Sequence, residues 1–281
     1  METAEEKALT PSLVDGSRQL AIEIRAQREL ALSQPRDEGR VFKKALAGLE
    51  FAPEFAEDAY YAIPFNKKDE DSGETVKEFV EGLSVVASRD IVRLWGNCAT
   101  AWRIAGEDDK AFEVEGVFSD FETNTFFRAT VRVRKSYIPR GTSIPVPLRE
   151  DRLNLAIQAG GSKAERNAAL KGIPGWFKDR YFQAAKAIAG RKGKAEGKSV
   201  EDRKAALFAA FVKLGATKEQ VEVYIAEKFP GDSGSDDFFG TMRGILNGIK
   251  DKHTTVAEVF TAKKVEEKGA VKLGNIPGSG L

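Results

Sequence analysis

The chain has 281 residues, of which 42% are hydrophobic and 31% charged, and it carries a net charge of +1. A single cysteine, Cys98, excludes a disulfide framework and a cysteine-rich zinc site, and no apolar run reaches the roughly 18 residues of a membrane span. The acidic N-terminal residues lack the apolar stretch of a secretion signal, so we expect an intracellular protein with one sizeable core and a smaller module.

The first 57 residues are expected to form an N-terminal helical unit, which is a candidate for oligomerisation. Leu20, Ile24 and Leu32 recur at helical spacing within residues 17–32, with arginines on the polar side. A second helix is expected after Pro35, because proline suits the first position of a helix.

An α+β core is expected over residues 58–190. It opens with a short aromatic strand from Ala59 to Phe65 and a charged loop from Asn66 to Gly73. Apolar residues then recur at helical spacing from Val80 to Trp95, and Gly96-Asn97 provides a C-terminal stop. The sequence therefore predicts a strand, a loop and a helix ahead of the main sheet.

Three strands are expected next, over Cys98–Ile104, Ala111–Ser119 and Thr125–Tyr137. Apolar and polar residues alternate with a period of two in the second and third, which predicts one buried face and one wet face. Short connections make the three strands an antiparallel meander. A proline-rich loop from Ile138 to Pro147 follows.

Helices are expected from there on, first over residues 149–170 and 174–189. The pair Gly160-Gly161 is a candidate break in the first of them. We therefore expect an α+β fold in which a three-stranded antiparallel β-meander packs with flanking helices.

A small all-helical C-terminal module is expected over residues 199–261. Residues 191–198 have the glycine- and lysine-rich composition of a flexible linker, and residues 262–281 that of a disordered tail. Thr217 is expected to cap a helix of this module, with Gln220 completing a capping box.

Few residues offer enzyme chemistry. The sole histidine, His253, lies far from Cys98 in the sequence, and no glycine-rich phosphate loop of the nucleotide-driven recombinases is present. Asp120 and Glu122 are the best paired carboxylates and could hold Mg²⁺ in a nuclease, although a hairpin turn needs acidic residues there as well. We therefore expect no catalytic residues, no metal and no cofactor.

The charge is divided unevenly along the chain. Residues 1–127 hold 15 basic and 26 acidic residues, whereas residues 128–195 hold 16 basic and 4 acidic ones. A basic block of this kind is typical of a protein that binds a polyanion over a confined area. Alternatively, the two blocks neutralise each other, within one subunit or between subunits.

The third expected strand carries the densest row of cations. Arg128, Arg132 and Arg134 share one face, at a spacing close to that of phosphates on an extended single strand. We expect Phe118 to pair with Ala129. That register places Glu115 opposite Arg132 and Glu113 opposite Arg134, so that exposed cross-strand ion pairs would explain the row equally well.

The candidate DNA-binding residues are basic or amide side chains of the core: Arg89, Asn97, Arg128, Arg132, Arg134, Lys135, Arg140, Arg149, Arg152, Lys163, Arg166, Asn167, Lys171, Lys178 and Arg180. Aromatic residues among them could stack on bases. Trp95 and Trp102 are expected in the core, while Phe126, Trp176 and Tyr181 stay open to either role.

Five segments over residues 60–185 resemble the phage single-strand annealing recombinases of the RecT and Redβ type. They are Gly82-Leu83-Ser84, Ala87-Ser88-Arg89, Leu94-Trp95-Gly96-Asn97, Asp120-Phe121-Glu122-Thr123-Asn124 and Ala164-Glu165-Arg166-Asn167-Ala168. The resemblance implies DNA held in a basic groove between subunits of a ring or filament, and annealing without ATP. It places Arg89, Asn97, Asn124, Arg166 and Asn167 in the matched segments.

The C-terminal segments Leu214–Val221 and Thr254–Phe260 are similar to a helical appendage of such phage proteins. The resemblance implies that this appendage docks a partner, such as a host single-strand-binding protein or a phage exonuclease.

We therefore expect a homo-oligomeric protein of phage recombination that binds and anneals single-stranded DNA in the cytoplasm of the bacterial host. Three alternatives remain: a DNA-coating structural protein without annealing activity, a Mg²⁺-dependent nuclease, and a protein-interaction module whose charges are only solvated.

Overall fold

The structure is a computed structural model that describes residues 4–68, 75–139 and 142–260. It confirms the α+β fold: a three-stranded antiparallel sheet packs with helices and is followed by C-terminal helices. Within the described ranges, no helix is both long enough and apolar enough to cross a membrane. The tail expected over residues 262–281 lies outside these ranges.

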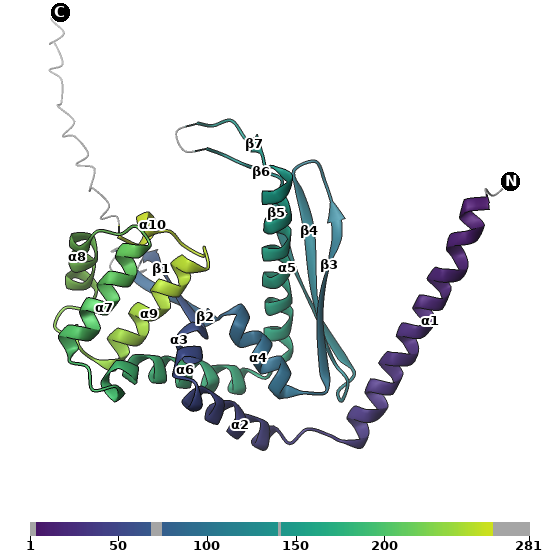
Figure 1. Cartoon of the computed structure of the whole chain (residues 1–281), viewed down its shortest axis with the longest axis horizontal. Helices are drawn as coiled ribbons and strands as arrows, with labels where there is room; N and C mark the ends of the chain where they lie inside the picture. Colours follow the sequence, from purple (N-terminus) through teal and green to yellow (C-terminus); the bar gives the residue numbers. More distant parts are fainter. Residues whose placement is uncertain (1–3, 69–74, 140–141, 261–281) are drawn as a thin grey trace, which may run out of the picture.

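The N-terminal part consists of α1 (Ala4–Ser33), α2 (Glu38–Phe51) and α3 (Pro53–Asp58). Asp37 caps α2, because its side chain accepts a hydrogen bond from the amide of Arg40. Figure 1 shows α1 leaving the body of the molecule, and the side chains of Ile22, Leu30 and Leu32 on it are exposed. The two expected helices are thus present.

The next segment corrects one prediction. Strand β1 (Tyr60–Lys68) pairs with β2 (Thr75–Leu83), so residues 80–83 are strand and not the start of a helix. Helix α4 (Val85–Trp95) begins only after Ser84, whose Oγ accepts the amide of Ala87 at 3.1 Å. The pattern from Val80 suits either element, and pairing with β1 decides it because the backbone groups of β1 need partners.

The main sheet has the order β3-β4-β5, with β3 (Cys98–Glu107), β4 (Ala111–Asp120) and β5 (Thr125–Arg134) antiparallel to one another. One face packs on α5 (Glu150–Gly172), which approaches the strands closely at Gly116 of β4. A Cβ on Gly116 would lie 2.2 Å from the backbone of Ala164. The expected third strand is interrupted after Arg134, and its last residues form the short strand β6 (Ser136–Tyr137), which pairs with β7 (Val146–Pro147) in the expected loop.

Gly160-Gly161 does not break α5. A Cβ on Gly160 would meet Val133 at 2.3 Å, and one on Gly161 would meet the Trp102 ring at 2.4 Å. The two glycines therefore serve packing against the sheet, and their lack of side chains lets an unbroken helix lie close to it.

The linker expected over residues 191–198 is wrong for its first part, because α6 (Gly175–Ala195) continues through it. The remaining helices are α7 (Val200–Lys213), α8 (Lys218–Lys228), α9 (Asp236–Lys250) and α10 (Val256–Phe260), and the expected capping box of Thr217 and Gln220 is confirmed. Gly190 lies against α9, where a Cβ would come within 2.1 Å of the Asp236 carbonyl oxygen. Residues 190–195 are thus part of a packed helix.

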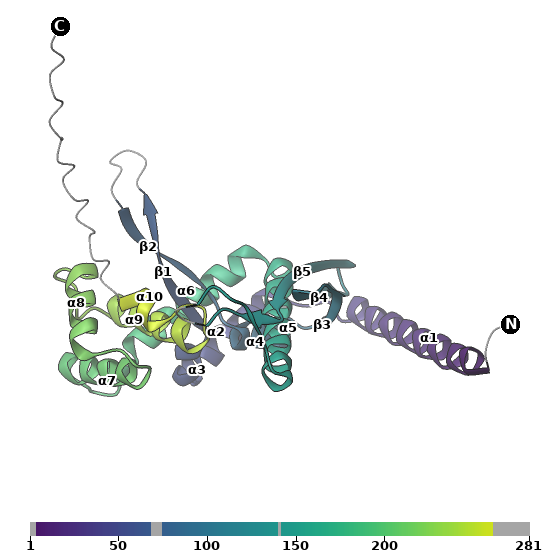
Figure 2. The ribbon, with the colours of Figure 1, turned by 90° about the horizontal axis from the view of Figure 1, so that it is seen from above.

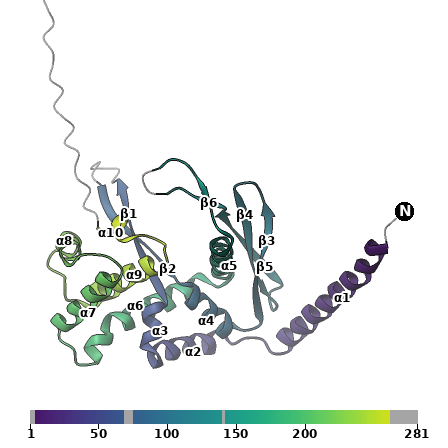
Figure 3. The same ribbon diagram turned by 45° about the horizontal axis from the view of Figure 1, so that its top comes forward.

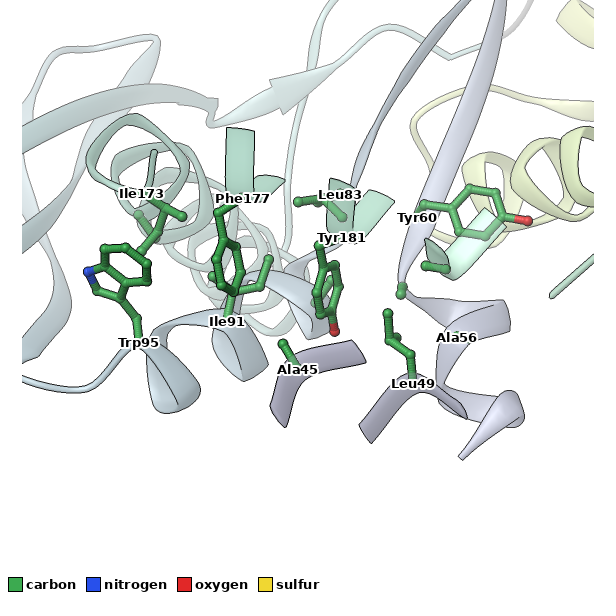
Figure 4. Close-up of a cluster of buried hydrophobic side chains, with 14 of the residues drawn as sticks. Ala45, Leu49, Ala56, Tyr60, Leu83, Ile91, Trp95, Ile173, Phe177 and Tyr181 are labelled. Atoms are coloured by element: carbon green, nitrogen blue, oxygen red, sulfur yellow. The ribbon is translucent and has the colours of Figure 1, made fainter. Parts of the chain in front are cut away.

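Two large groups of buried side chains hold these elements together, and a smaller one of Val114, Val133 and Ala164 lies between the main sheet and α5. Figure 4 shows the first, in which Trp95, Phe177 and Tyr181 pack between α2, α4 and α6. The second surrounds Phe238 of α9 and extends to α7, α8 and α10. Tyr60 connects the two, since it is fully buried and its hydroxyl donates to the Gly240 carbonyl of α9 at 2.7 Å.

Candidate nucleic-acid interface

The face of the sheet that turns away from α5 carries a row of arginines. Paired residues share a face, and the register pairs Arg103 with Glu115, Arg128 with Val117, and Arg132 with Glu113. Arg134 lies on the same face, opposite Ala111. We call this surface, with its four arginines, the open sheet face; Figure 2 shows α5 on the other side of the strands.

The register differs from the expected one by two residues, because Phe118 pairs with Phe127 and not with Ala129. The cause is the turn after β4. Asp120 Oδ1 accepts the amides of Glu122 and Thr123, and Asn124 adopts a left-handed φ of 56°, so the chain reverses within four residues.

Ion pairs cover part of the open sheet face. Arg103 lies 3.0 Å from Glu115, Arg128 lies 4.0 Å from the same carboxylate, and Arg132 pairs with Asp108 of the β3–β4 turn. All these arginine side chains are more than half exposed. Among the described residues, no carboxylate lies within ion-pair distance of Arg134. The ion pairs of this face are therefore weak. Arg128 is only weakly paired, and among the described residues Arg134 has no carboxylate partner.

An exposed aromatic ring accompanies the arginines. Phe126 is 61% exposed on the open sheet face, and the Arg128 guanidinium lies 5.2 Å from its ring centre. Lys171 of α5 donates to the Arg128 carbonyl at 2.9 Å, which brings a helix cation to the outer edge of β5. Lys135, just after β5, pairs with Glu107 at 2.5 Å and lies over the Phe112 ring. Cations and an aromatic ring therefore meet along the edge strand of the sheet.

Asn97 has a different environment from the one expected of a DNA ligand. Its side-chain amide donates to the Gln34 carbonyl at 2.8 Å and to Glu122 at 2.6 Å. Arg36, which the sequence did not single out, reaches the same place and lies 2.6 Å from Asp120 and 3.0 Å from Glu122. Asn97 thus ties the segment after α1 to the β4–β5 turn.

The carboxylates considered for Mg²⁺ lie in this cluster. Burial raises the pKa of Asp120, but hydrogen bonds from Arg36, the Thr123 amide and Trp95, with the Arg36 charge, leave that pKa below its ordinary value. Both carboxylates are therefore engaged as partners of an arginine that is itself buried.

A second basic surface lines a cavity of about 670 Å³ beside α5. Figure 3 shows α5 between the sheet and α9, with α4 below, and these three helices line the cavity together with Val131 of β5. Lys163 and Arg166 of α5 lie in its wall, and Asn167 accepts two hydrogen bonds from Arg166. Arg89 of α4 lies close by, bonded to Ser162 and to Glu165, both at 3.3 Å.

The other candidates are more scattered. Lys178 donates to the Leu170 carbonyl, and Arg180 is exposed on α6. Arg149 and Arg152 are exposed at the start of α5, Arg149 as its N-cap residue and Arg152 in its first turn. Arg140 lies outside the described residues. The structure therefore divides the fourteen candidates that it describes between the open sheet face, the cavity and isolated positions, and β5 separates the first two groups.

The aromatic candidates divide in the same way. Trp95 and Tyr181 are buried core residues, whereas Trp102, which was expected in the core, packs against α5 but is 37% exposed. Trp176 is partly exposed and makes an edge contact with Phe42 at 5.5 Å. Phe126 is the aromatic residue among the five that lies with the arginines of the open sheet face.

Several residues of these surfaces were not singled out in the sequence. Arg103 lies on the open sheet face, and its alternation with Trp102 within β3 is the signal that could have placed it there. Tyr61 adjoins the cavity and Lys252 lines it. Both come from segments at least 80 residues from α5 along the chain, and no local pattern reveals that they meet α5.

No protein-family model, no curated protein and no solved structure gives a significant match to this chain. The resemblance to the annealing recombinases stays a prediction.

Proposed function

We propose that the protein binds single-stranded DNA along the open sheet face and the edge of β5, and that it promotes the pairing of complementary strands. The observation that carries the proposal is the row of Arg103, Arg128, Arg132 and Arg134 on one exposed face, beside the exposed Phe126 ring. The binding requires neither a nucleotide cofactor nor bond breaking, because it uses charge and stacking alone.

The spacing of the arginines suits an extended single strand of DNA. Side chains two residues apart on a β-strand are about 7 Å apart, which is close to the phosphate spacing of an extended single strand. Exposed ion pairs such as Arg103–Glu115 contribute only about 0.2–1 kcal/mol. Phosphates can therefore replace the carboxylate partners at little cost in free energy.

Annealing follows from neutralising the charge of two strands. Repulsion between phosphates opposes pairing, and arginines that neutralise them release counterions and leave the base edges free. Stacking in the new duplex then stabilises the product, so no external energy source is needed.

The proposal includes self-association into a ring or filament, because linked copies raise the effective concentration of weak sites. It is supported by α1, which leaves the body with the apolar side chains of Ile22, Leu30 and Leu32 exposed. We place this activity in phage recombination within the bacterial cytoplasm, with a single-strand-binding protein or an exonuclease as the partner of the C-terminal helices.

The test measures DNA affinity and annealing of complementary oligonucleotides without nucleotide, over a series of salt concentrations. Replacing the two least paired arginines together, Arg128→Gln and Arg134→Gln, should weaken single-strand binding about tenfold or more and slow annealing in parallel. The slope of log affinity against log salt should fall by about 1.4, since about 0.7 is lost per single-strand phosphate contact.

The matched control is Lys213→Gln with Lys218→Gln, which removes two exposed charges from α7 and α8 and should change neither quantity. Binding without faster annealing would favour a DNA-coating protein. Equal affinity in both double variants would contradict the open sheet face as the binding surface.

A further inference from the structure

The cavity beside α5 has a cationic wall. Of the charged side chains that line it, Lys163, Arg166, Lys250 and Lys252 are basic, and Asp58 and Asp251 are acidic. The cations come from α5 and from the end of α9, which are distant in the sequence. The cavity therefore has a positive excess that the fold, and not one charged segment, creates.

Arg166 has spare hydrogen-bonding capacity in this wall. The residue is only 7% exposed, and its Nε and Nη2 both donate to Asn167 Oδ1, at 3.1 and 2.9 Å. Its Nη1 is buried without a hydrogen-bond partner among the described residues. A buried guanidinium N–H that lacks an acceptor is costly, so this group favours an anionic ligand that can accept from it.

The N-terminus of α4 lies at the same cavity. Ser84, Val85 and Val86 line the cavity, and the amides of Val85 and Val86 occupy the first turn, where no helix carbonyl can accept from them. No acidic residue in that turn competes for these amides. The positive end of the helix dipole and the buried Arg166 thus act on one space.

Aromatic packing holds Arg166 in place. The ring of Tyr61 lies 5.4 Å from the Arg166 guanidinium and 4.6 Å from the ring of His253. Burial, followed by the charges of Lys163 and Arg166, lowers the pKa of His253 to about 4. The imidazole therefore stays neutral near pH 7 and senses the positive potential of the cavity wall.

We propose that this cavity is a phosphate-binding site, in which Arg166, Lys163 and the first-turn amides of α4 bind the phosphate oxygens. Donors of three different origins line this one cavity, and the charge-assisted hydrogen bonds that the two cationic side chains can make are the strong ones. The phosphate could belong to a bound DNA strand or to a free mononucleotide. The site lies across β5 from the open sheet face, so it does not depend on the function proposed above.

His253 is the only histidine of the chain, so its imidazole serves as the probe of phosphate binding. In protein labelled at histidine, NMR should show one imidazole signal, and its titration is followed from pH 8 to pH 3.5. A bound phosphate stabilises the imidazolium ion, so inorganic phosphate should raise the pKa of His253 by about one unit. Acetate at equal ionic strength should leave the pKa of His253 unchanged.

Two variants link that signal to the cavity. Arg166→Gln should weaken phosphate binding, measured by calorimetry, about tenfold or more, and Lys163→Gln should weaken it in the same direction. Lys163 lies at a half-buried position, so its variant serves if Arg166→Gln lowers the melting temperature too far. Lys213→Gln on α7 is the control and should bind phosphate as the original protein does.

Two further ligands identify the source of the phosphate. An unphosphorylated oligothymidylate that shifts the His253 signal would show that strand phosphates enter the cavity, whereas a shift by thymidine monophosphate alone would show a site for small nucleotides. Both results support the proposal. A His253 signal that phosphate leaves unmoved, or moves equally in the Arg166 variant, overturns it, and the Arg128/Arg134 variant tests the open sheet face separately.

Discussion

Arg36 shows how one side chain connects two distant parts of the chain. It lies in the segment between α1 and α2, and its guanidinium is 2.6 Å from Asp120 at the end of β4. The Arg36 guanidinium also lies 4.6 Å from the centre of the Trp95 ring, which adds a cation–π interaction. Buried charge must be paired, so each partner depends on the other for its place in the fold.

Replacing Asp120 by Asn should therefore destabilise the protein. We expect the free energy of unfolding at pH 7 to fall by about 2–3 kcal/mol, since Arg36 would keep only Glu122 as a charged partner. Because the folded-state pKa of Asp120 is lowered, its contribution is present above the ordinary aspartate pKa of about 3.9 and is lost as the pH falls through the folded-state value.

Urea unfolding at pH 7 and at pH 3 measures the unfolding free energy of Asp120→Asn and of the original protein. The difference in unfolding free energy between Asp120→Asn and the original protein should be smaller at pH 3, because the pH has then fallen toward the lowered pKa of Asp120. Asp109→Asn, in the exposed β3–β4 turn, is the control and should be neutral. An equal difference at both pH values would show that the ion pair is not the source of the stability.

At the scale of elements, the closeness of α5 to the sheet decides which face stays open. Glycines at Gly116, Gly160 and Gly161 let the helix backbone approach the strands, and the helix covers the inner face over its length. The arginines can then occupy only the outer face, because the inner face holds no room for a solvated charge. The packing of α5 thus exposes the arginine row.

Replacing Gly116 by Ala should disturb that packing. The new Cβ would lie 2.2 Å from the backbone of Ala164, and backbone cannot move aside as a flexible side chain can, so we expect a loss of about 2–3 kcal/mol in unfolding free energy. Gly48→Ala is the matched control, since its Cβ meets no atom within 4 Å and lies inside α2.

That control should raise the unfolding free energy by about 0.5–1 kcal/mol, because alanine is the better helix former. Chemical denaturation of both variants gives the comparison. A Gly116→Ala protein as stable as the Gly48→Ala protein would mean that α5 does not lie so close to β4.

At the scale of the whole molecule, the C-terminal helices are packed into the core. The Asn247 side chain of α9 donates to the Tyr60 carbonyl at 2.9 Å, and Gly244 lies against Tyr60 and Ala62 of β1. Tyr60 and Ala62 are both fully buried. The C-terminal helices therefore complete the environment of β1, so we expect them to be needed for the core to fold.

A chain that ends after Gly190 should lack a cooperative thermal transition, because it exposes Tyr60, Ala62 and the inner side of α6. A chain that ends after Phe260 keeps these contacts and should melt as the full chain does. Circular dichroism during heating distinguishes them. A cooperative transition in the shorter chain, with DNA binding retained, would establish the independent module that the sequence suggests.

Local patterns were sufficient to predict the strands of the main sheet and most of the helices. The alternation in β4 and β5 predicts the meander, and Thr217 with Gln220 predicts a helix start, because each depends on neighbours within a few residues. The register of β5 was missed by two residues, since the turn hydrogen bonds of Asp120 are not encoded in the alternation. Val80 was assigned to a helix for a similar reason, because its partner strand is distant.

The tertiary structure determines which residues that are distant in the sequence contact one another. The linker was expected to begin directly after Gly190, and only the contact of Gly190 with α9 shows why a residue without a side chain is needed there. Arg166 was a candidate from the sequence, but Tyr61, His253 and the first turn of α4 join it only through long-range packing. Residue order determines which elements form, whereas burial of their apolar faces determines which charges they bring together.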